Sequence, residues 1–574
     1  MRHACACLLL ATLVAASSAC GRTGGGHDGG DDQAPDVGDG GDARRDALMH
    51  KETCRTANTI CDEQMVIACA NGENAAVLET CPDMCSHGRC TTSACAAAES
   101  SDSARGCRFY GVQVDNVDSD EEKNTMLILT NDSTEATANA TVSLRSPGYP
   151  WAPMSAVMVP RGGSVRVELA RPAREPGLTP AGAFRVDSDA PLLVVELVGD
   201  DSAQDSRSSA GTVLRPLQAL GSNHMAVTVG ERATAAVTQT PGSRDGAGAI
   251  ALVGTADGTH VIVQPTARAL IDAAGSIGLP SVDFPFTLND GDVFQLYAAT
   301  PGTDLTGTTV SSDRPLAAFS GNVYTTYGYD VTGFNGGDLA MEQLPPTESW
   351  GMEYIGASMS PQAGCDPFFS PGYARWQVVA LRDMTNVTLA KEPDMLVDVP
   401  SLTFVLNQGE SRVFFVHAES PGPGLPPPRP GDFVARADQP ILLAQWLDCE
   451  PGLSWGIDTR FSPTDVLFAL PPNFDHEVTV VREAGTQVSF DGKVIDDARF
   501  AIVSRQPTPG SDQVQYEAAR LTSADLGPCA TTQDRCEHRL SGGAFGVAWR
   551  GMDVVCSYAV TVPPSDICTL GCVP

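Results

Sequence analysis

Cysteines are the residues whose number and spacing imply the most chemistry in this sequence. Eight of them lie close together: Cys54, Cys61, Cys69, Cys81, Cys85, Cys90, Cys95 and Cys107. A segment of this size cannot bury enough apolar surface to be stable alone, and disulfides are the usual remedy in exported proteins. We therefore predict a disulfide-rich module over residues 51–107.

A zinc site is the alternative for the centre of this module. Cys81, Cys85, His87 and Cys90 together offer a set of thiolate and imidazole ligands. The spacing lacks the CxxC pair of common structural zinc sites, and an oxidising compartment favours disulfides. The sequence therefore favours disulfides over zinc.

The other cysteines outside the first twenty residues are spread over the rest of the chain: Cys365, Cys449, Cys529, Cys536, Cys556, Cys568 and Cys572. We expect them to form disulfides as well, with Cys365–Cys449 and Cys529–Cys536 as the proposed pairs. Spacing alone does not fix connectivity. Because 15 of the 18 cysteines follow residue 20, at least one is free or bound to another molecule.

A run of carboxylates is the one candidate metal site. Asp115, Asp118, Asp120 and Glu121 lie close together and supply the hard oxygen ligands that Ca²⁺ prefers. A solvated acidic loop is the favoured interpretation, and weak calcium binding is the alternative. We predict no cofactor and no other metal.

Familiar catalytic motifs give little support for an enzyme. The sequence contains no HExxH and no phosphate-binding glycine loop. We therefore predict a protein that is not an enzyme. An envelope carbohydrate-active hydrolase with paired carboxylates stays as the alternative, because Asp and Glu number 70.

The N-terminus has the features of an export signal. Residues 1–20 run from Arg2 through an apolar stretch to Ser18-Ala19-Cys20. Small residues before a cysteine resemble a bacterial lipobox, so Cys20 is the candidate lipidation site, with plain cleavage and secretion as the alternative. Residues 21–50 are rich in Gly and Asp, which predicts a disordered tether. We place the protein at the outer membrane or cell surface, and expect membrane contact through the lipid anchor alone.

Composition defines the fold class. The chain of 574 residues has 56 Gly, 41 Pro and only 19% charged residues, which suits many short strands joined by turns. We predict an all-β fold. The net charge of −33 excludes a basic nucleic-acid-binding surface.

An internal repeat organises the rest of the chain. An Asp-x-Pro turn followed by an apolar strand recurs at Asp189, Asp313 and Asp438. We predict tandem β-sandwich modules over residues 108–210, 211–340 and 341–460, followed by a cysteine-containing β module over residues 461–574. A β-propeller-like arrangement of the repeats is the alternative.

Two of these segments carry a resemblance to a known family. Thr306-Gly307-Thr308-Thr309-Val310-Ser311-Ser312-Asp313-Arg314-Pro315 and Glu342-Gln343-Leu344-Pro345-Pro346, with the signal, tether and cysteine module, resemble the IgGFc-binding-protein N-terminal domain family, in its myxobacterial secreted or lipoprotein form. The resemblance implies an extracellular binding or adhesion module. It supplies no catalytic residues.

These observations predict the function. We expect a lipid-anchored binding or adhesion protein of the bacterial envelope. Its partner is expected to be an extracellular protein or polysaccharide, and not nucleic acid.

Overall fold

The computed structural model describes most of the chain beyond the N-terminal fifty residues. Residues 51–574 form one compact unit. The described residues are 54, 59–70, 73–100, 104–112, 114, 124–170, 176–198, 210–230, 246–300, 302–325, 338–359, 375–418, 431–447, 452–460, 463–471, 474–504, 515–527, 536–552 and 557–562.

The cysteine module contains a small sheet, a hairpin and one helix. The elements are β1 (Thr59–Asp62), β2 (Met65–Ala70), β3 (Glu73–Thr80), β4 (Met84–Ser86), β5 (Arg89–Thr91) and α1 (Ser93–Glu99). The helix begins at Thr92, whose side chain accepts a hydrogen bond from the Cys95 backbone N–H and so satisfies one of the free donors of the first turn.

Four disulfides hold this module together, as predicted for its eight cysteines. The bonds are Cys54–Cys69, Cys61–Cys85, Cys81–Cys90 and Cys95–Cys107. Three of the four atoms of the alternative zinc set are therefore sulfurs of disulfides, and the zinc interpretation is wrong. The last bond joins α1 to the first strand of the repeat region, which couples the module covalently to it.

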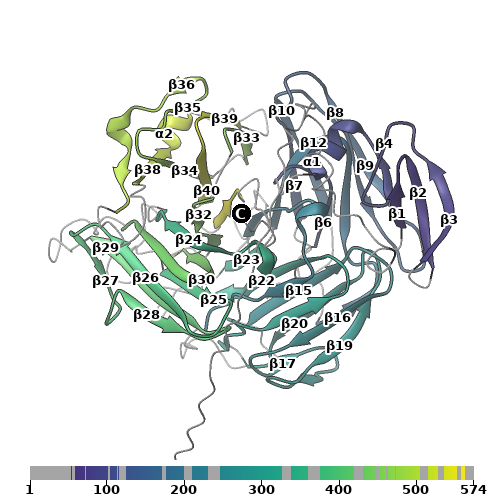
Figure 1. The fold of residues 1–574 in the computed structure, drawn as a ribbon, viewed down its shortest axis with the longest axis horizontal. Coiled ribbons are helices and arrows are strands. Elements are labelled where there is room, and N and C mark those ends of the chain that lie inside the picture. The colour runs from purple at the N-terminus through teal and green to yellow at the C-terminus, as the bar shows by residue number, and fades with distance from the viewer. Residues whose placement is uncertain are drawn as a thin grey trace, which may run out of the picture. The chain divides into compact units, whose positions relative to one another are not determined.

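The repeat region contains four units of the same topology, and Figure 1 labels many of their strands. Unit 1 contains β6 (Gly106–Gly111), β7 (Asn124–Asn131), β8 (Ala138–Leu144), β9 (Ala152–Val159), β10 (Gly163–Ala170), β11 (Gly177–Thr179), β12 (Phe184–Val198) and β13 (Ala210–Val213). The long strand β12 belongs to two four-stranded layers. Its second half lies in β10-β7-β12-β13, and its first half lies in β9-β8-β12-β6.

Unit 2 repeats these two layers with its long strand divided in two. It contains η1 (Leu217–Ala219), β14 (Asn223–Met225), β15 (Gly248–Gly254), β16 (Thr259–Gln264), β17 (Ala269–Leu270), β18 (Ile277–Gly278), β19 (Phe284–Leu288), β20 (Val293–Ala298), β21 (Thr309–Ser312), β22 (Leu316–Thr325) and β23 (Asp338–Gln343). The layers are β20-β15-β22-β23 and β19-β16-β21-β14. Strand β11 of unit 1 also pairs with β20, so the two units share a sheet.

Unit 3 has an undivided long strand, like unit 1. It contains η2 (Thr347–Ser349), β24 (Gly351–Gly356), β25 (Arg375–Ala380), β26 (Thr385–Lys391), β27 (Met395–Val397), β28 (Thr403–Leu406), β29 (Ser411–Ala418), β30 (Phe433–Trp446), β31 (Leu453–Trp455) and β32 (Ile457–Asp458). The layers are β29-β25-β30-β31 and β28-β26-β30-β24.

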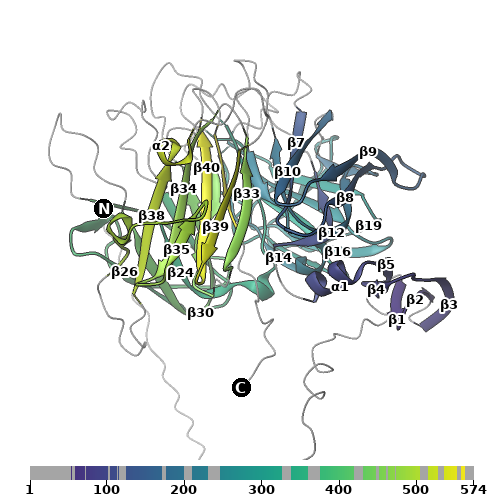
Figure 2. The same ribbon diagram turned by 90° about the horizontal axis from the view of Figure 1, so that it is seen from above.

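Unit 4 completes the set, and Figure 2 shows its strands β38, β34 and β40 next to one another. It contains β33 (Asp465–Leu470), β34 (Asp475–Glu483), β35 (Val488–Phe490), β36 (Lys493–Val494), η3 (Asp497–Arg499), β37 (Ala501–Ile502), β38 (Tyr516–Thr522), α2 (Ser523–Leu526), β39 (Cys536–Gly542), β40 (Phe545–Met552) and β41 (Ser557–Thr561). The layers are β38-β34-β40-β41 and β36-β35-β39-β33. The prediction of an all-β fold is confirmed.

The Asp-x-Pro motif does not form the predicted turn in every unit. Asp189 and Asp438 lie inside the continuous strands β12 and β30, and only Asp313 lies between two strands. Proline has no N–H to donate, so the motif marks the bend where the long strand leaves one layer for the other. In each case the aspartate carboxylate accepts a hydrogen bond from a backbone N–H near the beginning of a neighbouring strand. The pairs are Asn139 with Asp189 at 2.7 Å, His260 with Asp313 at 2.8 Å and Asn386 with Asp438 at 2.8 Å.

One strand near the end of each unit lies against the corresponding strands of at least two other units. β13 contacts β23 and β41, and β31 contacts the same two strands. We call β13, β23, β31 and β41 the inner strands. Their contacts form a closed cycle, a feature of the propeller alternative, whereas the paired layers within each unit are those of a sandwich.

Between successive units, a glycine lies so close to a proline of the next unit that no side chain would fit at the glycine. A Cβ atom on Gly106 would lie 2.3 Å from Pro216 Cβ, and one on Gly221 would lie 2.3 Å from Pro346 Cβ. Glycine is therefore required at the two equivalent joints because the backbone meets a rigid proline ring.

We predict that Gly221→Ala destabilises the protein. The added methyl group overlaps Pro346, which belongs to the chain turn leading into unit 3, and overpacking of this kind costs about 1–3 kcal/mol. Chemical denaturation of the full chain measures the loss. Gly278→Ala is the matched control, because its Cβ would meet the flexible Ile271 side chain at 3.2 Å. Equal stability of the two variants would contradict the proposed joint.

Candidate functional site

The inner strands bring four polar residues to equivalent positions. Thr212, Glu342, Ser454 and Thr561 lie directly opposite Glu196, Ser320, Gln445 and Ala548 of the neighbouring strand in their own sheets. Glu196, Ser320 and Gln445 each follow the motif proline by five residues. We call Thr212, Glu342, Ser454 and Thr561 the polar ring.

Hydrogen bonds link the polar ring from unit to unit. Thr212 Oγ1 donates to Glu342 Oε2 at 2.5 Å, which joins unit 1 to unit 2. The Trp455 indole N–H donates to the Gln343 carbonyl at 3.1 Å, which joins unit 3 to unit 2. Ser454 Oγ and Thr561 Oγ1 lie 2.6 Å apart and join units 3 and 4. Since buried polar groups require partners, these bonds fix the position of each inner strand.

Glu342 is the only acid of the polar ring, and it is 2% exposed. Burial raises the pKa of its carboxyl group well above the usual value, although Thr212 and the Arg215 guanidinium act in the opposite direction. Burial therefore favours the neutral form of this group. A neutral acid can bridge two strands without placing an uncompensated charge among buried residues.

A small pocket lies beside the polar ring. Trp455, Tyr354, Asp458 and Thr561 contribute to its lining, and its volume is about 30 Å³. Such a volume holds one or two water molecules, whereas small-molecule sites measure about 300 Å³ or more. Asp458 accepts hydrogen bonds from Arg460, with Nε 2.9 Å from Oδ1. The pocket is thus a structural feature of the joint between the units and not a substrate site.

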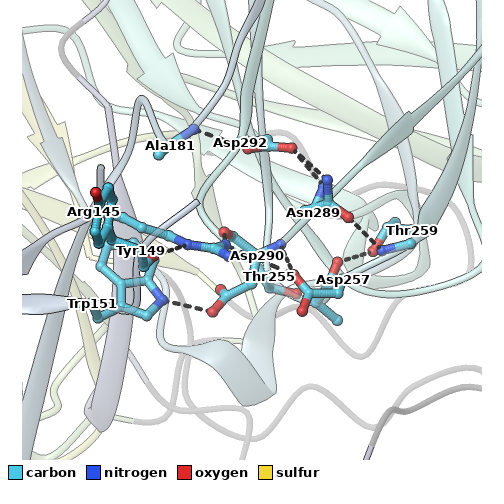
Figure 3. Close-up of polar contacts among 12 residues, drawn as sticks. Arg145, Tyr149, Trp151, Ala181, Thr255, Asp257, Thr259, Asn289, Asp290 and Asp292 are labelled. Atoms are coloured by element: carbon cyan, nitrogen blue, oxygen red, sulfur yellow. Dashed lines mark hydrogen bonds and ion pairs between the residues drawn. The ribbon is translucent and has the colours of Figure 1, made fainter. Parts of the chain in front are cut away.

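A second polar cluster joins units 1 and 2, and Figure 3 shows it. The hairpin between β19 and β20 carries Asp290, whose carboxylate accepts the Trp151 indole N–H at 2.6 Å and the Tyr110 hydroxyl at 3.0 Å. Arg145 donates to the Asp290 carbonyl and, through Nε, to the Tyr149 carbonyl at 3.1 Å. Gly291 follows with φ of +80°, and a Cβ there would lie 2.7 Å from the Trp151 ring.

Charges in this cluster are balanced by close ion pairs. Arg108 Nε lies 2.6 Å from Asp187, and Arg185 Nε lies 2.7 Å from the same carboxylate. Burial opposes ionisation of Asp187, but the two guanidinium groups lower its pKa overall. Burial raises the pKa of Asp290 despite its donors. The Arg185 guanidinium also lies over the Trp151 ring, 4.6 Å from its centroid. The cluster therefore serves as an interface between units.

Buried histidines have structural positions. His224 is 2% exposed and burial lowers its pKa to about 3, and burial lowers the pKa of His476 to about 4. Neither is charged at neutral pH. Among the described residues, no group of three or more His, Cys, Asp or Glu side chains could hold a metal ion.

Several predicted site residues lie outside the described part of the chain. They are Cys20, Asp115, Asp118, Asp120, Glu121, Cys365, Cys449, Cys529, Cys556, Cys568 and Cys572. The lipidation site, the calcium site and the two proposed pairs of the later cysteines therefore stay predictions. Cys536 is in a disulfide.

Sequence reasoning missed both polar clusters. Thr212, Ser454 and Thr561 look like ordinary strand residues, and nothing local distinguishes Glu342 from a solvent-facing acid. The available signal was the repeat itself. Aligning the strands at the motif proline places Glu196, Ser320 and Gln445 at one position, and a polar residue there in three apolar strands indicates a buried polar layer.

The described residues form four linked β units with polar clusters at their joints. The family model of the IgGFc binding protein matches residues 210–551, which is more than half of the chain. The protein therefore belongs to this family. A comparison with curated proteins finds no match.

Family membership settles the coarse function. The family is an extracellular, non-enzymatic class of binding domain, so the protein is a binding protein, and the match gives no support to the hydrolase alternative. In the described residues, no helix is long and apolar enough to cross a membrane. An extracellular binding domain fits an exported protein.

We predict that Glu342→Gln removes a pH-dependent loss of stability. The folded pKa of Glu342 exceeds its unfolded value, so its stabilising contribution is complete below the unfolded pKa and is lost as the pH rises toward the folded pKa, by about 1.4 kcal/mol per pH unit. Glutamine stays neutral and keeps the acceptor oxygen. The melting temperature of the variant relative to wild type should therefore increase as the pH rises above about 5.

Glu135→Gln is the control for this experiment. Glu135 is exposed, and its substitution removes the same charge as Glu342→Gln. Its difference from wild type should stay constant over that pH range. A difference for Glu342→Gln that is constant or decreases with pH would show that Glu342 is ionised in the folded protein.

Proposed function

We propose that the protein is a lipid-anchored adhesion protein of the bacterial envelope, whose units 2 to 4 bind an extracellular protein or polysaccharide. The observation that carries the proposal is the family match, because residues 210–551 begin at the first inner strand and end in β40. The binding family thus coincides with three of the four joined units.

The contacts between units support a binding role over a flexible spacer role. A surface that must recognise a partner gains affinity when it is rigid before binding. The polar ring, the shared sheet of units 1 and 2 and the Asp290 cluster each restrict movement of one unit against another. Loops at the ends of such units are then held in a fixed arrangement.

Contacts at the joint of units 3 and 4 add to this rigidity. Arg520 Nη1 lies 3.1 Å from Asp432 and its Nε donates to the Ser358 carbonyl at 2.8 Å. A guanidinium that bridges a carboxylate and a carbonyl of another unit holds both in a defined geometry.

The N-terminal segments supply the anchor in this proposal. Cys20 carries the lipid, residues 21–50 form the tether, and the cysteine module at residues 51–107 begins the folded part. The four module boundaries near residues 107, 210, 340 and 460 belong to the same proposal.

We predict that Cys20→Ala abolishes lipid attachment. The sulfur of Cys20 is the acceptor atom in the proposed lipoprotein, so cells fed a radiolabelled fatty acid should label the wild-type chain and not the variant, which should appear in the medium. Cys7→Ala is the matched control, because it removes a cysteine of the same segment. Label that persists in Cys20→Ala would place the anchor elsewhere.

We predict saturable binding of one extracellular ligand by the full chain. The probes are the Fc fragment of immunoglobulin G and exopolysaccharide from the producing organism, passed over immobilised protein in a surface plasmon resonance measurement. The Fab fragment is the matched control, since it comes from the same antibody without Fc. One probe should bind and be recovered with unchanged mass.

Two results would contradict this function. Absence of binding by both probes would remove the two ligand classes proposed. Recovery of shortened polysaccharide would identify a hydrolase instead, because a binding protein returns its ligand intact.

A further inference from the structure

Strand β9 of unit 1, with the loop before it, is an uncharged stretch on an acidic protein. Residues 146–160 contain no Asp, Glu, Lys or Arg, while the whole chain has a net charge of −33. Tyr149 is 68% exposed, Met154 41% and Met158 72%. Exposed apolar side chains that cluster on one segment mark an interaction surface.

The loop before β9 is held rigidly. The Tyr149 backbone N–H donates to the Ser146 carbonyl at 3.0 Å, and Gly148 between them has φ of +77°, as in a turn that requires glycine. Arg145 donates to the Tyr149 carbonyl, and Trp151 is hydrogen-bonded to Asp290. The Tyr149 ring is therefore presented to solvent on an ordered backbone, so its binding to a partner costs little conformational entropy.

β9 is also the free edge of its sheet. Among the described strands it pairs with β8 alone, so its other side has backbone N–H and C=O groups that can pair with a further strand. Pro153 and Pro160 lack an N–H and limit such pairing to the residues between them.

We propose that this surface, β9 with residues 146–151, binds a second copy of the chain through antiparallel pairing of the two β9 strands. Charge favours this occupant. Two chains of net charge −33 repel, and they approach best where neither carries a charge, which is this stretch. In every antiparallel register that keeps residues 154–159 opposite residues 146–160 of the other copy, each residue faces an uncharged one.

The surface lies in unit 1, outside the family-matched residues 210–551, so this contact is separate from the ligand binding proposed above. On anchored copies it would join neighbouring molecules or facing cells. Homotypic adhesion of this kind needs no additional partner.

Sedimentation equilibrium of the full chain tests the proposal. We expect a monomer–dimer equilibrium whose dissociation constant falls about fivefold between about 50 and about 500 mM salt, because salt screens the repulsion of the acidic chains. Met158→Asp should weaken the dimer by about tenfold or more. The two copies each add one carboxylate to the same interface, so the contact receives two new negative charges. Its unchanged melting curve would show that it folds.

Met384→Asp is the matched control, because Met384 is 67% exposed in unit 3. It adds the same charge and should leave the dimer unchanged. Equal weakening by both variants would show that net charge alone governs association and would overturn the proposal, as would a monomer at every salt concentration.

Two further outcomes identify other contacts. A dimer that survives denaturing electrophoresis without reductant is a disulfide dimer, which the odd number of cysteines permits, and it contradicts pairing through β9. A chain that stays monomeric but binds the Fc fragment only when Met158 is intact uses this surface for a foreign protein, and this too rejects the homotypic contact.

Discussion

The contact of unit 4 with unit 1 is the constraint on which the rest of the structure depends. Met126 and Ile128 of β7 and Leu193 of β12 share one buried apolar cluster with Phe468 and Trp549 of unit 4. Units 1 and 4 are farther apart in the sequence than any other two units. Bringing them together therefore carries the largest loop-closure entropy cost, which the burial of these apolar side chains offsets. Once this contact forms, each of the four units has a neighbour on both sides, and the inner strands can meet.

Repetition of one topology does not require repetition of its residues. The first strand of a unit pairs with the long strand, and at one position of this pairing two units have an ion pair. In unit 1 the first strand supplies the cation, Arg108, and the long strand the anion, Asp187. In unit 3 the charges are exchanged, with Glu353 on the first strand and Arg436 on the long strand. In unit 2, Asn223 and Ser311 occupy the same position. Complementarity across the ladder is what is kept, because like charges placed opposite each other would destabilise the pair. The chain thus preserves interactions and not side chains.

Much of the fold could be predicted from the sequence, and the reason is local chemistry. The Gly- and Pro-rich composition and the recurring Asp-x-Pro followed by an apolar strand indicated strands and their period, and the dense cysteines indicated disulfides. The motif at Asp189 and Asp438 was misjudged as a turn, because a bend within a strand and a turn between strands use the same residue types. Only the pairing of the long strand with both layers shows that the chain bends there without turning back. The polar ring was beyond local reasoning, because β13 and β41, the strands of Thr212 and Thr561, meet only when the chain closes.

Electrostatics links the buried ring to the outer surface. In the interior, charge is either removed, as at Glu342, or balanced, as at Asp187, because the desolvation of a single charge is costly. Outside, the net charge of −33 keeps the chains apart, which makes an uncharged edge the point of least repulsion between them. A protein that makes one specific contact between its own copies needs both properties: general repulsion prevents indiscriminate aggregation, and a limited neutral stretch such as residues 146–160 confines contact to one geometry.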